Sequence, residues 1–567
     1  MTGGTLNIVG QGDVDSMDTA NGYYDTTYTA YRAFVRTLYT YASAPTFSGQ
    51  VNAVPDLATA LPVVTNSGKT YTITIRQGAM WNTTPPRQVT AADEIRGIMR
   101  LCNPASPAGA IAYYTATIVG FNDFCNGTSG SGGGFSAVDP TSASAMANYM
   151  NSTPVAGMKA TSNLTIQFTL TQPSSDFVNI LSMYFAAPAP VEYNSYIVGS
   201  ATQAQHTISD GPYTITNYNP TVSITFGKDP AWQQSTDPVH HQYVNGIQVT
   251  EGVATATAAV QQVQAGTQDM LWDQIVPPAQ LATMTNDPNL VIGPQGTAYA
   301  TNNPTLDMNI QSPNNGGALS KLGVRQAIEY AINKTAVSQV YGGAAVSAPL
   351  DQVVLPGAQG YVGGFNPYPT SGHNGDAAKA KQMLQAAGYQ PGQITLKLIY
   401  RTTTVHPQVA TTDQAALQAA GFTVQLIPVT PSNTFYTKYL QNPTATKAGS
   451  WDLAESGWSP DWYGPTNARS TIVPLFDGRS YGPGSNDYMD YNNSVVNGYI
   501  DKALSATSLS ASTQNWQLAA QQIMHDAVVV PEGQQKNPVN HSSRLKNAIF
   551  WNFSENFDVT QAWLQGG

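Results

Sequence analysis

A cluster of aromatic and acidic residues is the part of the sequence best suited to hold a ligand. Residues 451–465 read WDLAESGWSPDWYGP, with three tryptophans, one tyrosine and three carboxylates. Glycine and proline interrupt this stretch, which puts Trp458, Asp461, Trp462 and Tyr463 on a loop. Aromatic faces beside an acid suit an amphipathic, amine-bearing or sugar-like ligand. The tryptophans could equally fill an interface between two lobes, and composition alone favours neither interpretation.

The usual sequence signatures of catalysis and metal binding are absent. The sequence Gly68-Lys69-Thr70 ends like a phosphate-binding loop, but Val63 stands where that loop needs glycine, and a strand follows it. We therefore predict a hairpin turn there. His240 and His241 lie in a proline-flanked stretch without an acidic or cysteine partner at a fixed spacing. With no HExxH and no GxSxG sequence, we expect no enzyme, no metal site and no cofactor.

The chain has two cysteines, Cys102 and Cys125, in a segment rich in turn-forming residues. We predict that they form a disulfide that closes a surface loop, which contributes about 3 kcal/mol in the entropic model. The alternative is a pair of unrelated buried thiols. A structural disulfide indicates an oxidising compartment, and the lack of a CxxC sequence argues against a redox or zinc site.

Composition narrows the class of protein further. The 567-residue chain exceeds what one hydrophobic core serves, so two or three domains are expected. Only 10% of its residues are charged, and the net charge is -10. This balance argues against nucleic acid as a partner, because binding phosphates needs clustered Lys and Arg. No apolar stretch reaches the ~20 residues that span a bilayer.

Hydrophobic periodicity predicts a β-rich first half. Residues 70–76 and 163–170 alternate between apolar and polar side chains, as half-buried strands do. Thr90 and Asp93 have the spacing of a capping box, which marks the start of a helix. We therefore expect strands and loops to dominate this half.

The second half has a different pattern. Helical spacing over residues 321–341 and 376–388 is followed by a strand at 394–400, another helix, and a strand at 423–429. This order predicts a βαβ unit in a largely parallel sheet. Residues from about 291 to 530 are therefore expected to form a separate α/β lobe.

The order of these motifs resembles that of the family 5 extracytoplasmic solute-binding proteins of ABC transporters, the group that contains dipeptide and oligopeptide receptors. The resemblance runs colinearly over nearly the whole chain. The matching segments are Gly4–Ile8, Asp56–Ala58 through Lys69–Trp81, Thr90–Ile95, Gly211–Tyr213, Lys228–Trp232, Val324–Ile332, Ala378–Tyr389 and Gly457–Asp461, the last of which reads GWSPD against the family's GWxxD.

The resemblance implies an α/β fold of the periplasmic-binding-protein type, with two lobes, a ligand cleft between the lobes and an extra subdomain in the first lobe. Lobe I is expected to comprise residues 1–49, 210–290 and 534–567. The extra subdomain would be residues 50–209, and lobe II residues 291–533. Closure of the lobes on the ligand is expected by the same analogy.

The resemblance also implies roles for particular residues. In the family's peptide receptors the Asp of GWxxD pairs with the terminal ammonium of the ligand, a role that falls to Asp461 here. Gly457, Trp458 and Ser459 would offer main-chain hydrogen bonds to a strand-like peptide. One departure is Gly464-Pro465, where the family often has an acid before the proline.

The other end of the ligand and the facing wall are assigned more loosely. Arg401 and His406, just after the strand at 394–400, occupy the region where dipeptide receptors hold the ligand's carboxylate. Tyr23 and Tyr24 follow the first strand and are candidates for stacking, as are Trp462 and Tyr463 on the acidic loop.

The resulting hypothesis is a receptor that captures short peptides for the permease subunits of an ABC importer. The alternative ligands are an oligosaccharide, because aromatic platforms stack on sugar rings, and a siderophore or metal complex. We expect a monomer outside the cytoplasm, either periplasmic or a cell-surface lipoprotein, whose signal segment is missing from this sequence. A lipid anchor would be its only contact with the membrane.

Overall fold

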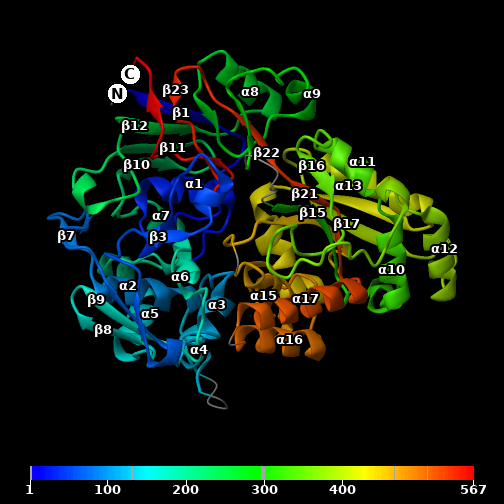
Figure 1. The fold of residues 1–567 in the computed structure, drawn as a ribbon, viewed down its shortest axis with the longest axis horizontal. Coiled ribbons are helices and arrows are strands. Elements are labelled where there is room, and N and C mark those ends of the chain that lie inside the picture. Colours follow the sequence, from blue (N-terminus) through cyan, green and yellow to red (C-terminus); the bar gives the residue numbers. More distant parts are fainter. Residues whose placement is uncertain (1–2, 129–132, 295–300, 465, 507, 567) are drawn as a thin grey trace. The chain divides into compact units, whose positions relative to one another are not determined.

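The computed structural model describes residues 3–128, 133–294, 301–464, 466–506 and 508–566. The chain divides into two compact units, the first made of residues 1–274 and 540–567 and the second of residues 275–539 (Figure 1). The lobe and subdomain boundaries given above stay predictions. None of the described helices is long and apolar enough to cross a bilayer.

The first unit is built on a mixed sheet with the strand order β10-β11-β12-β1-β13. β1 is parallel to β12 and β13, while β11 is antiparallel to both β10 and β12. Leu6 and Ile8 of β1 are fully buried, as the period-two pattern requires. The strands are β1 (Thr5–Val9), β10 (Tyr213–Asn219), β11 (Ser223–Lys228), β12 (Gly246–Thr250) and β13 (Met270–Leu271).

A second, antiparallel sheet of this unit confirms the predicted strands and hairpin. Its order is β4-β5-β9-β8, and β4 and β5 flank the turn at residues 66–69. Tyr71, Ile73 and Ile75 are buried, as their alternation predicts. The strands are β4 (Val63–Thr65), β5 (Thr70–Thr74), β8 (Met158–Ser162) and β9 (Thr165–Thr169). Short ribbons pair β2 (Tyr39–Tyr41) with β3 (Ala53–Pro55), β6 (Met80–Trp81) with β7 (Arg87–Gln88), β23 (Leu545–Lys546) with β26 (Trp563–Leu564), and β24 (Phe550–Trp551) with β25 (Asn556–Phe557).

The helices of the first unit include the predicted capping box. The Thr90 side chain accepts a hydrogen bond from the Asp93 N–H, and the Asp93 carboxylate accepts one from the Thr90 N–H. The helices are α1 (Asp25–Phe34), α2 (Ala91–Met99), α3 (Ile111–Thr115), α4 (Phe121–Asn126), α5 (Ala143–Ser152), α6 (Phe177–Ile180), α7 (Ala201–Ala204) and α8 (Ala256–Gln264).

Buried arginines connect distant segments of the first unit. Arg32 of α1 pairs with Asp558 near the C-terminus at 2.9 Å, and Arg36 pairs with Asp56 at 2.6 Å. All four side chains are almost fully buried, where a charge is tolerated only with a partner. The first pair joins α1 to the C-terminal segment, and the second joins the residues that follow α1 to the segment at Asp56.

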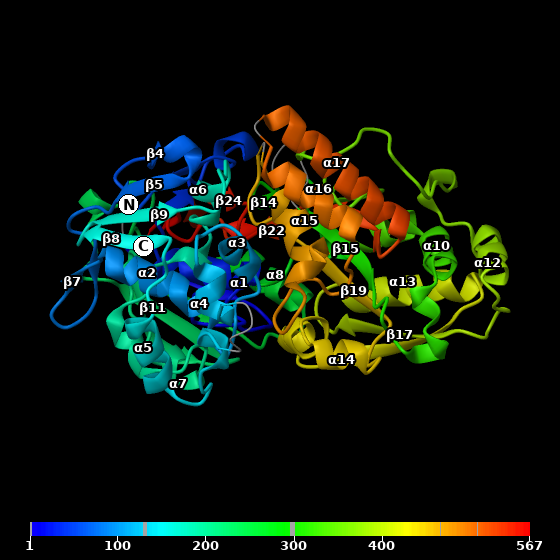
Figure 2. The ribbon, with the colours of Figure 1, turned by 90° about the horizontal axis from the view of Figure 1, so that it is seen from below.

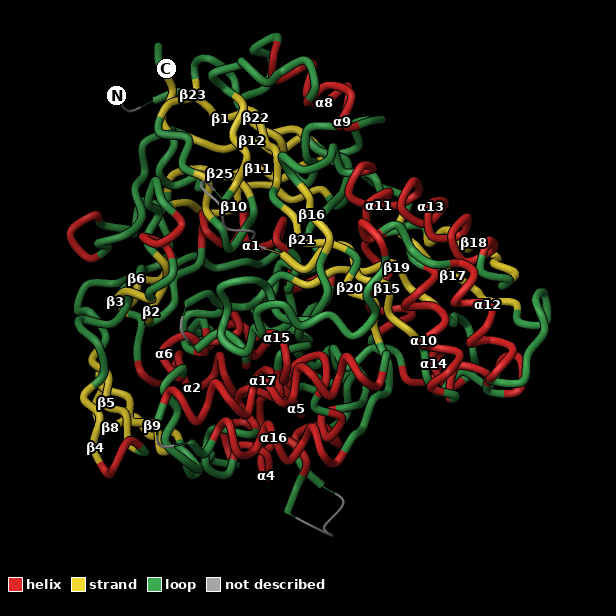
Figure 3. Tube along the Cα trace, turned by 45° about the vertical axis from the view of Figure 1, so that its right-hand side comes forward, coloured by secondary structure: helices red, strands yellow, loops and turns green. Residues whose placement is uncertain are grey.

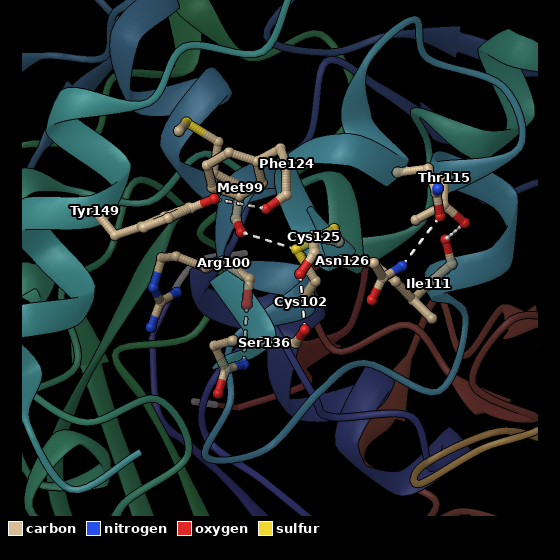
Figure 4. Close-up of a disulfide and its surroundings, with 12 residues drawn as sticks. Met99, Arg100, Cys102, Ile111, Thr115, Phe124, Cys125, Asn126, Ser136 and Tyr149 are labelled. Atoms are coloured by element: carbon tan, nitrogen blue, oxygen red, sulfur yellow. Dashed lines mark hydrogen bonds between the residues drawn. A yellow bond between two sulfur atoms is a disulfide. The ribbon is translucent and has the colours of Figure 1, made fainter. Parts of the chain in front are cut away.

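The predicted disulfide is present. Cys102, at the end of a short 3-10 helix, is bonded to Cys125 of α4 (Figure 4). Both sulfur-bearing residues are buried rather than at the surface, at 5% and 1% exposure. Phe124, the neighbour of Cys125, lies 5.3 Å from the ring of Tyr149, so the bridge lies beside an aromatic core.

The second unit contains a mixed sheet with the order β16-β21-β15-β19-β17-β18, with β20 also paired to β15. β18, β17 and β19 are parallel, as predicted, but β15 is antiparallel to β19, β20 and β21. The expectation of a largely parallel sheet is therefore wrong. The strands are β15 (Thr301–Met308), β16 (Ser347–Pro349), β17 (Thr395–Arg401), β18 (Thr423–Val429), β19 (Leu453–Trp458), β20 (Val529–Pro531) and β21 (Gly533–Gln535); β14 (Leu290–Gly293) pairs with β22 (Asn537–Asn540).

The helical stretch predicted for residues 321–341 is two helices. Asn333 separates them because its side chain caps the second helix by accepting from the Ala336 N–H. The helices of this unit are α9 (Pro278–Leu281), α10 (Leu322–Ala331), α11 (Lys334–Val340), α12 (Ala377–Ala386), α13 (His406–Ala419), α14 (Pro443–Lys447), α15 (Arg469–Phe476), α16 (Ser494–Leu504) and α17 (Leu509–Asp526).

These helices form two groups. α11 and α13 pack against each other and against the sheet, next to α10 and α12 (Figure 3). α15 and α16 pack on α17 (Figure 2). α12 begins and ends as predicted, since the Asp376 side chain caps it and Gly388 follows it with a φ of 92° that favours glycine.

Removing the disulfide should destabilise the first unit. In the double variant Cys102→Ser/Cys125→Ser, the unfolded chain regains the freedom of a loop of 23 residues' separation, a loss of about 3 kcal/mol. Chemical denaturation monitored by circular dichroism would measure it. Addition of reductant should have the same effect on the wild type and none on the variant. Equal stability of the two oxidised proteins would contradict the prediction.

Candidate ligand-binding site

The predicted site residues of the second unit gather where two parallel strands end. β17 and β19 are paired at Leu398 with Leu453 and at Ile399 with Ala454. β17 then ends at Arg401, and β19 continues to Trp458. Carboxyl ends of parallel strands are the usual place for ligands in open α/β sheets. The structure therefore brings Arg401 and Gly457, which are 56 positions apart, to the same edge of one sheet.

Arg401 lies on a pair of aromatic rings. Its guanidinium carbon is 5.7 Å from the ring centre of Phe435 and 5.6 Å from that of Tyr436, within the range of a cation–π contact. The Tyr436 hydroxyl in turn donates to the Gly457 carbonyl at 3.5 Å. Tyr436 thus connects the predicted cation with the predicted peptide-binding strand.

His406 is held by an acid. Its Nδ1 lies 2.8 Å from the Glu455 carboxylate, and both side chains are buried. Burial lowers the pKa of His406, and the nearby charge of Arg401 lowers it further. The imidazole is therefore mostly neutral near pH 7, so Arg401 is the side chain of this pair that supplies a positive charge. Its predicted contact with a ligand carboxylate stays a prediction.

Trp458 and Trp462 are packed inside the second unit. Trp458 is 8% exposed and Trp462 is 0% exposed. Their indole N–H groups donate to the carbonyls of Ser470 and Thr466, at 2.9 and 3.1 Å. Trp458 is the last residue of β19 rather than part of the predicted loop, and the two buried indoles with bonded N–H groups hold the chain in place there. Tyr463 is likewise buried at 3%, and contact of these rings with a ligand stays a prediction.

The polar residues around the two indoles are more accessible. Gly457, Ser459 and Asp461 are each partly exposed, unlike the rings between them. A Cβ at Gly457 would lie 2.5 Å from the Asn303 side-chain oxygen, so a larger residue there would require the Asn303 side chain to move. The backbone and the carboxylate are therefore the accessible groups of this segment.

Tyr23 and Tyr24 belong to the first unit. Tyr24 precedes α1 as its N-cap residue, and the Tyr23 ring meets Phe185 edge-on at 4.9 Å. The Tyr23 N–H donates to the Asp15 carboxylate at 2.8 Å. Both tyrosines are partly exposed, and their predicted stacking role stays a prediction.

One group of side chains in the described residues has the spacing of metal ligands. Ligand atoms of Asp56, Asp237 and His240 lie within 4.8 Å of one another. Arg36 lies among them, 2.6 Å from Asp56 and 3.2 Å from Asp237, and His240 Nδ1 is 3.1 Å from Asp237. A guanidinium already balances the charge of these acids, so the group is explained as a buried ion-pair network.

Sequence reasoning missed a set of buried acids beneath the site. Glu455, Asp413 and Glu532 are all 0% exposed, and Asp307 is 4% exposed. Glu455 lies inside the aromatic and acidic segment and two residues before Gly457, which was a usable signal. Asp413, Glu532 and Tyr436 carry no such signal, because only the packing of α13 and the strands brings them to this place.

Comparison with known proteins identifies the class. A family model described as "Bacterial extracellular solute-binding proteins, family 5 Middle" matches residues 52–476. The dipeptide-binding protein of Escherichia coli (strain K12) is 26% identical over 358 residues, 61% of this chain and 56% of that protein. The glutathione-binding protein GsiB of Escherichia coli O1:K1 / APEC is 24% identical over 407 residues, 70% of this chain and 72% of GsiB. The chain thus matches little more than half the length of the first of these relatives.

Solved structures share the fold over nearly the whole chain. The clavulanic acid biosynthesis oligopeptide binding protein 2 superposes with a TM-score of 0.80 at 22% identity, covering 99% of this chain and 96% of that one. The murein tripeptide binding protein MppA of Escherichia coli gives 0.78 at 17% identity, covering 99% of both chains. The Helicobacter pylori DppA, solved with the peptide STSA, gives 0.75 at 19%, covering 99% and 98%.

The mixed α/β fold is that of the periplasmic binding proteins. Within that class, the chain belongs to the family 5 bacterial extracellular solute-binding proteins, whose model covers more than half of it. The family resemblance drawn from the motifs is thereby confirmed.

The buried pair Asp413 and Glu532 should make stability depend on pH. Burial raises the pKa of both carboxyl groups; the nearby charge of Glu455 raises that of Asp413 further, and Asp413 raises that of Glu532 further. The folded protein then keeps a proton that the unfolded chain releases above about pH 4, so the free energy of unfolding falls as pH rises, by up to about 1.4 kcal/mol per unit for each proton. Asp413→Asn, a permanently neutral analogue, should reduce this decline between pH 5 and 8.

Urea denaturation at several pH values would measure the effect. The control is Asp501→Asn, because the Asp501 side chain is 60% exposed. Its stability should follow the wild type at every pH. If the Asp413→Asn curve also runs parallel to that of the wild type, the pair does not hold a proton in the folded state.

Proposed function

We propose that this protein is the substrate-binding receptor of an ABC importer and that it captures short peptides. The proposal depends on one observation: a positively charged side chain and an accessible strand end lie at the same edge of the second unit's sheet. Arg401 lies on Tyr436, and Tyr436 is hydrogen-bonded to Gly457. The names of its relatives support this ligand class, since they bind dipeptides, glutathione and oligopeptides.

The chemistry of a peptide fits these groups. A peptide has an ammonium at one end, a carboxylate at the other and backbone hydrogen-bond groups between them. Asp461 would take the ammonium, Arg401 the carboxylate, and the main chain of Gly457–Ser459 would pair with the peptide backbone. Main-chain pairing gives affinity without reading side chains, which suits a receptor for many sequences.

The alternative of an oligosaccharide is less well supported. It depends on Trp458 and Trp462 as stacking platforms, and both indoles are buried with their N–H groups bonded. A siderophore or metal complex has no specific observation in its favour. Native mass spectrometry of the protein as purified would identify a retained ligand by its mass.

The remaining parts of the proposal concern the location of the protein, its partners and its conformational change. The protein would act outside the cytoplasm, as a periplasmic protein or a lipid-anchored monomer, pass its ligand to permease subunits and catalyse no reaction. Closure of two lobes around the ligand would appear in small-angle scattering as compaction when peptide is added.

The role of Asp461 can be tested with a thermodynamic cycle. Asp461→Asn should weaken the binding of a di- to pentapeptide mixture by about 10- to 100-fold, as expected for a lost charge-assisted hydrogen bond. Acetylating the peptide's N-terminus should weaken the wild type equally but the variant hardly at all. Isothermal titration calorimetry would measure all four affinities. Asp139→Asn, an exposed acid of the first unit, is the control and should bind like the wild type.

A corresponding cycle tests Arg401. Arg401→Gln should lose a similar factor in affinity, and amidation of the peptide's C-terminus should have little further effect on it. The matched control is Arg479→Gln, because Arg479 is 44% exposed and paired with acids at the surface. If amidation weakens the wild type and Arg401→Gln to the same extent, another group holds the carboxylate.

A further inference from the structure

A small cavity lies in the second unit, between the sheet and the segment around α15. It has a volume of ≈ 20 Å³, which is room for one group of the size of a water molecule. Apolar side chains form much of its wall, among them Val353, Leu475, Phe476 and Met489. Gly457 and Trp458 also line it, so it adjoins the proposed binding strand without being part of the contacts assigned above.

Two neighbouring strands supply several polar oxygen atoms to the wall, and Tyr488 also lines the cavity. Asp307 of β15 is buried, and its carboxylate accepts a hydrogen bond from the Ser456 hydroxyl. The Thr305 hydroxyl lies 3.0 Å from that of Ser456. Thr305 and Ser456 face each other in the register of β15 and β19, which is why these three side chains meet.

Asn302 adds an oxygen that has no hydrogen-bond partner among the described residues. Its side chain is 3% exposed and lines the same cavity. The amide nitrogen donates to the Val353 carbonyl, which fixes the orientation of the amide, and the oxygen Oδ1 is left unsatisfied. Buried polar atoms without a partner are rare and costly, so this oxygen indicates a missing ligand.

The charge of the cavity is also unbalanced. Burial raises the pKa of Asp307 to about 7, and the neighbouring charge of Glu455 contributes to the rise. Tyr436 also interacts electrostatically with Asp307. Around neutral pH, Asp307 is thus divided between a neutral acid and a buried carboxylate, for which the described residues provide no ion-pair partner.

We propose that this cavity binds a small monovalent cation, an alkali ion or an ammonium group, with Asp307 as the counter-charge. The hydroxyl oxygens of Thr305 and Ser456 and the amide oxygen of Asn302 are the neutral ligands. A single carboxylate balances a single positive charge. A divalent ion such as calcium or magnesium would leave one positive charge unbalanced beside this carboxylate.

The cation would stabilise the folded protein and compete with the proton on Asp307. Its binding therefore strengthens as pH rises through the pKa of that carboxyl group, from pH 6 to pH 8. This inference goes beyond the proposed function, and its test needs no peptide. A lack of cation binding would therefore not contradict peptide binding, and a lack of peptide binding would not contradict cation binding.

The first experiment measures the thermal unfolding midpoint of peptide-free protein in chloride salts at equal ionic strength. At pH 8, saturating Na⁺, K⁺ or NH₄⁺ should raise the midpoint relative to choline, which is too large to enter, by about 2–4 °C. The rise should be smaller at pH 6. Stabilisation by alkali ions identifies a free metal ion as the ligand, while stabilisation by ammonium alone identifies an ammonium group. Equal midpoints in all salts would overturn the proposal.

Substitutions in the cavity wall test whether the cation effect on the unfolding midpoint arises at this cavity. Asp307→Asn removes the counter-charge and should abolish the difference between the small cations and choline. Thr305→Val keeps the shape of the side chain and should weaken the same difference, which provides a second test if Asp307→Asn folds poorly. Asp413→Asn, a buried acid that does not line the cavity, should retain the full cation effect. Retention of the effect in both Asp307→Asn and Thr305→Val would overturn the proposal.

Discussion

The second unit depends on the register of one strand, β19. This strand is parallel to β17 on one side and antiparallel to β15 on the other, so it joins the two halves of the sheet. Successive side chains of a strand point to opposite faces. Glu455 accordingly meets His406, whereas Ser456 meets Asp307. A shift by one residue would exchange these faces and leave buried charges without their partners.

This arrangement places charged side chains in the protein interior, where burial of a charge costs free energy. The chain has few charged residues for its length, yet many of them lie inside the two units. In the first unit, Arg32 is paired with Asp558, and Arg36 is paired with Asp56 and Asp237. In the second, burial raises the pKa values of Asp413, Glu532 and Asp307, and neighbouring acids raise them further. Buried acids are thus paired with arginines in the first unit, whereas in the second unit their pKa values are raised.

The aromatic residues around the site differ in their roles. Trp458 and Trp462 look like ligand-binding residues in the sequence, but in the structure they pack and bond to backbone carbonyls. Phe435 and Tyr436, which no motif singles out, lie beneath Arg401. A residue type therefore indicates what a side chain can do, while its exposure decides whether it meets solvent or the core.

The sequence by itself determined the family, the main elements and the disulfide. Strand alternation at residues 70–76, the capping box at Thr90 and the helix stop at Gly388 all depend on short-range geometry, which local sequence specifies. Only the tertiary structure decided the antiparallel half of the second sheet and the grouping of Arg401, Tyr436 and Gly457. It also decided the meeting of Asp307 with Ser456, which is 149 positions away. Strand order and the pairing of distant side chains follow from how the whole chain packs, and no local pattern contains that information.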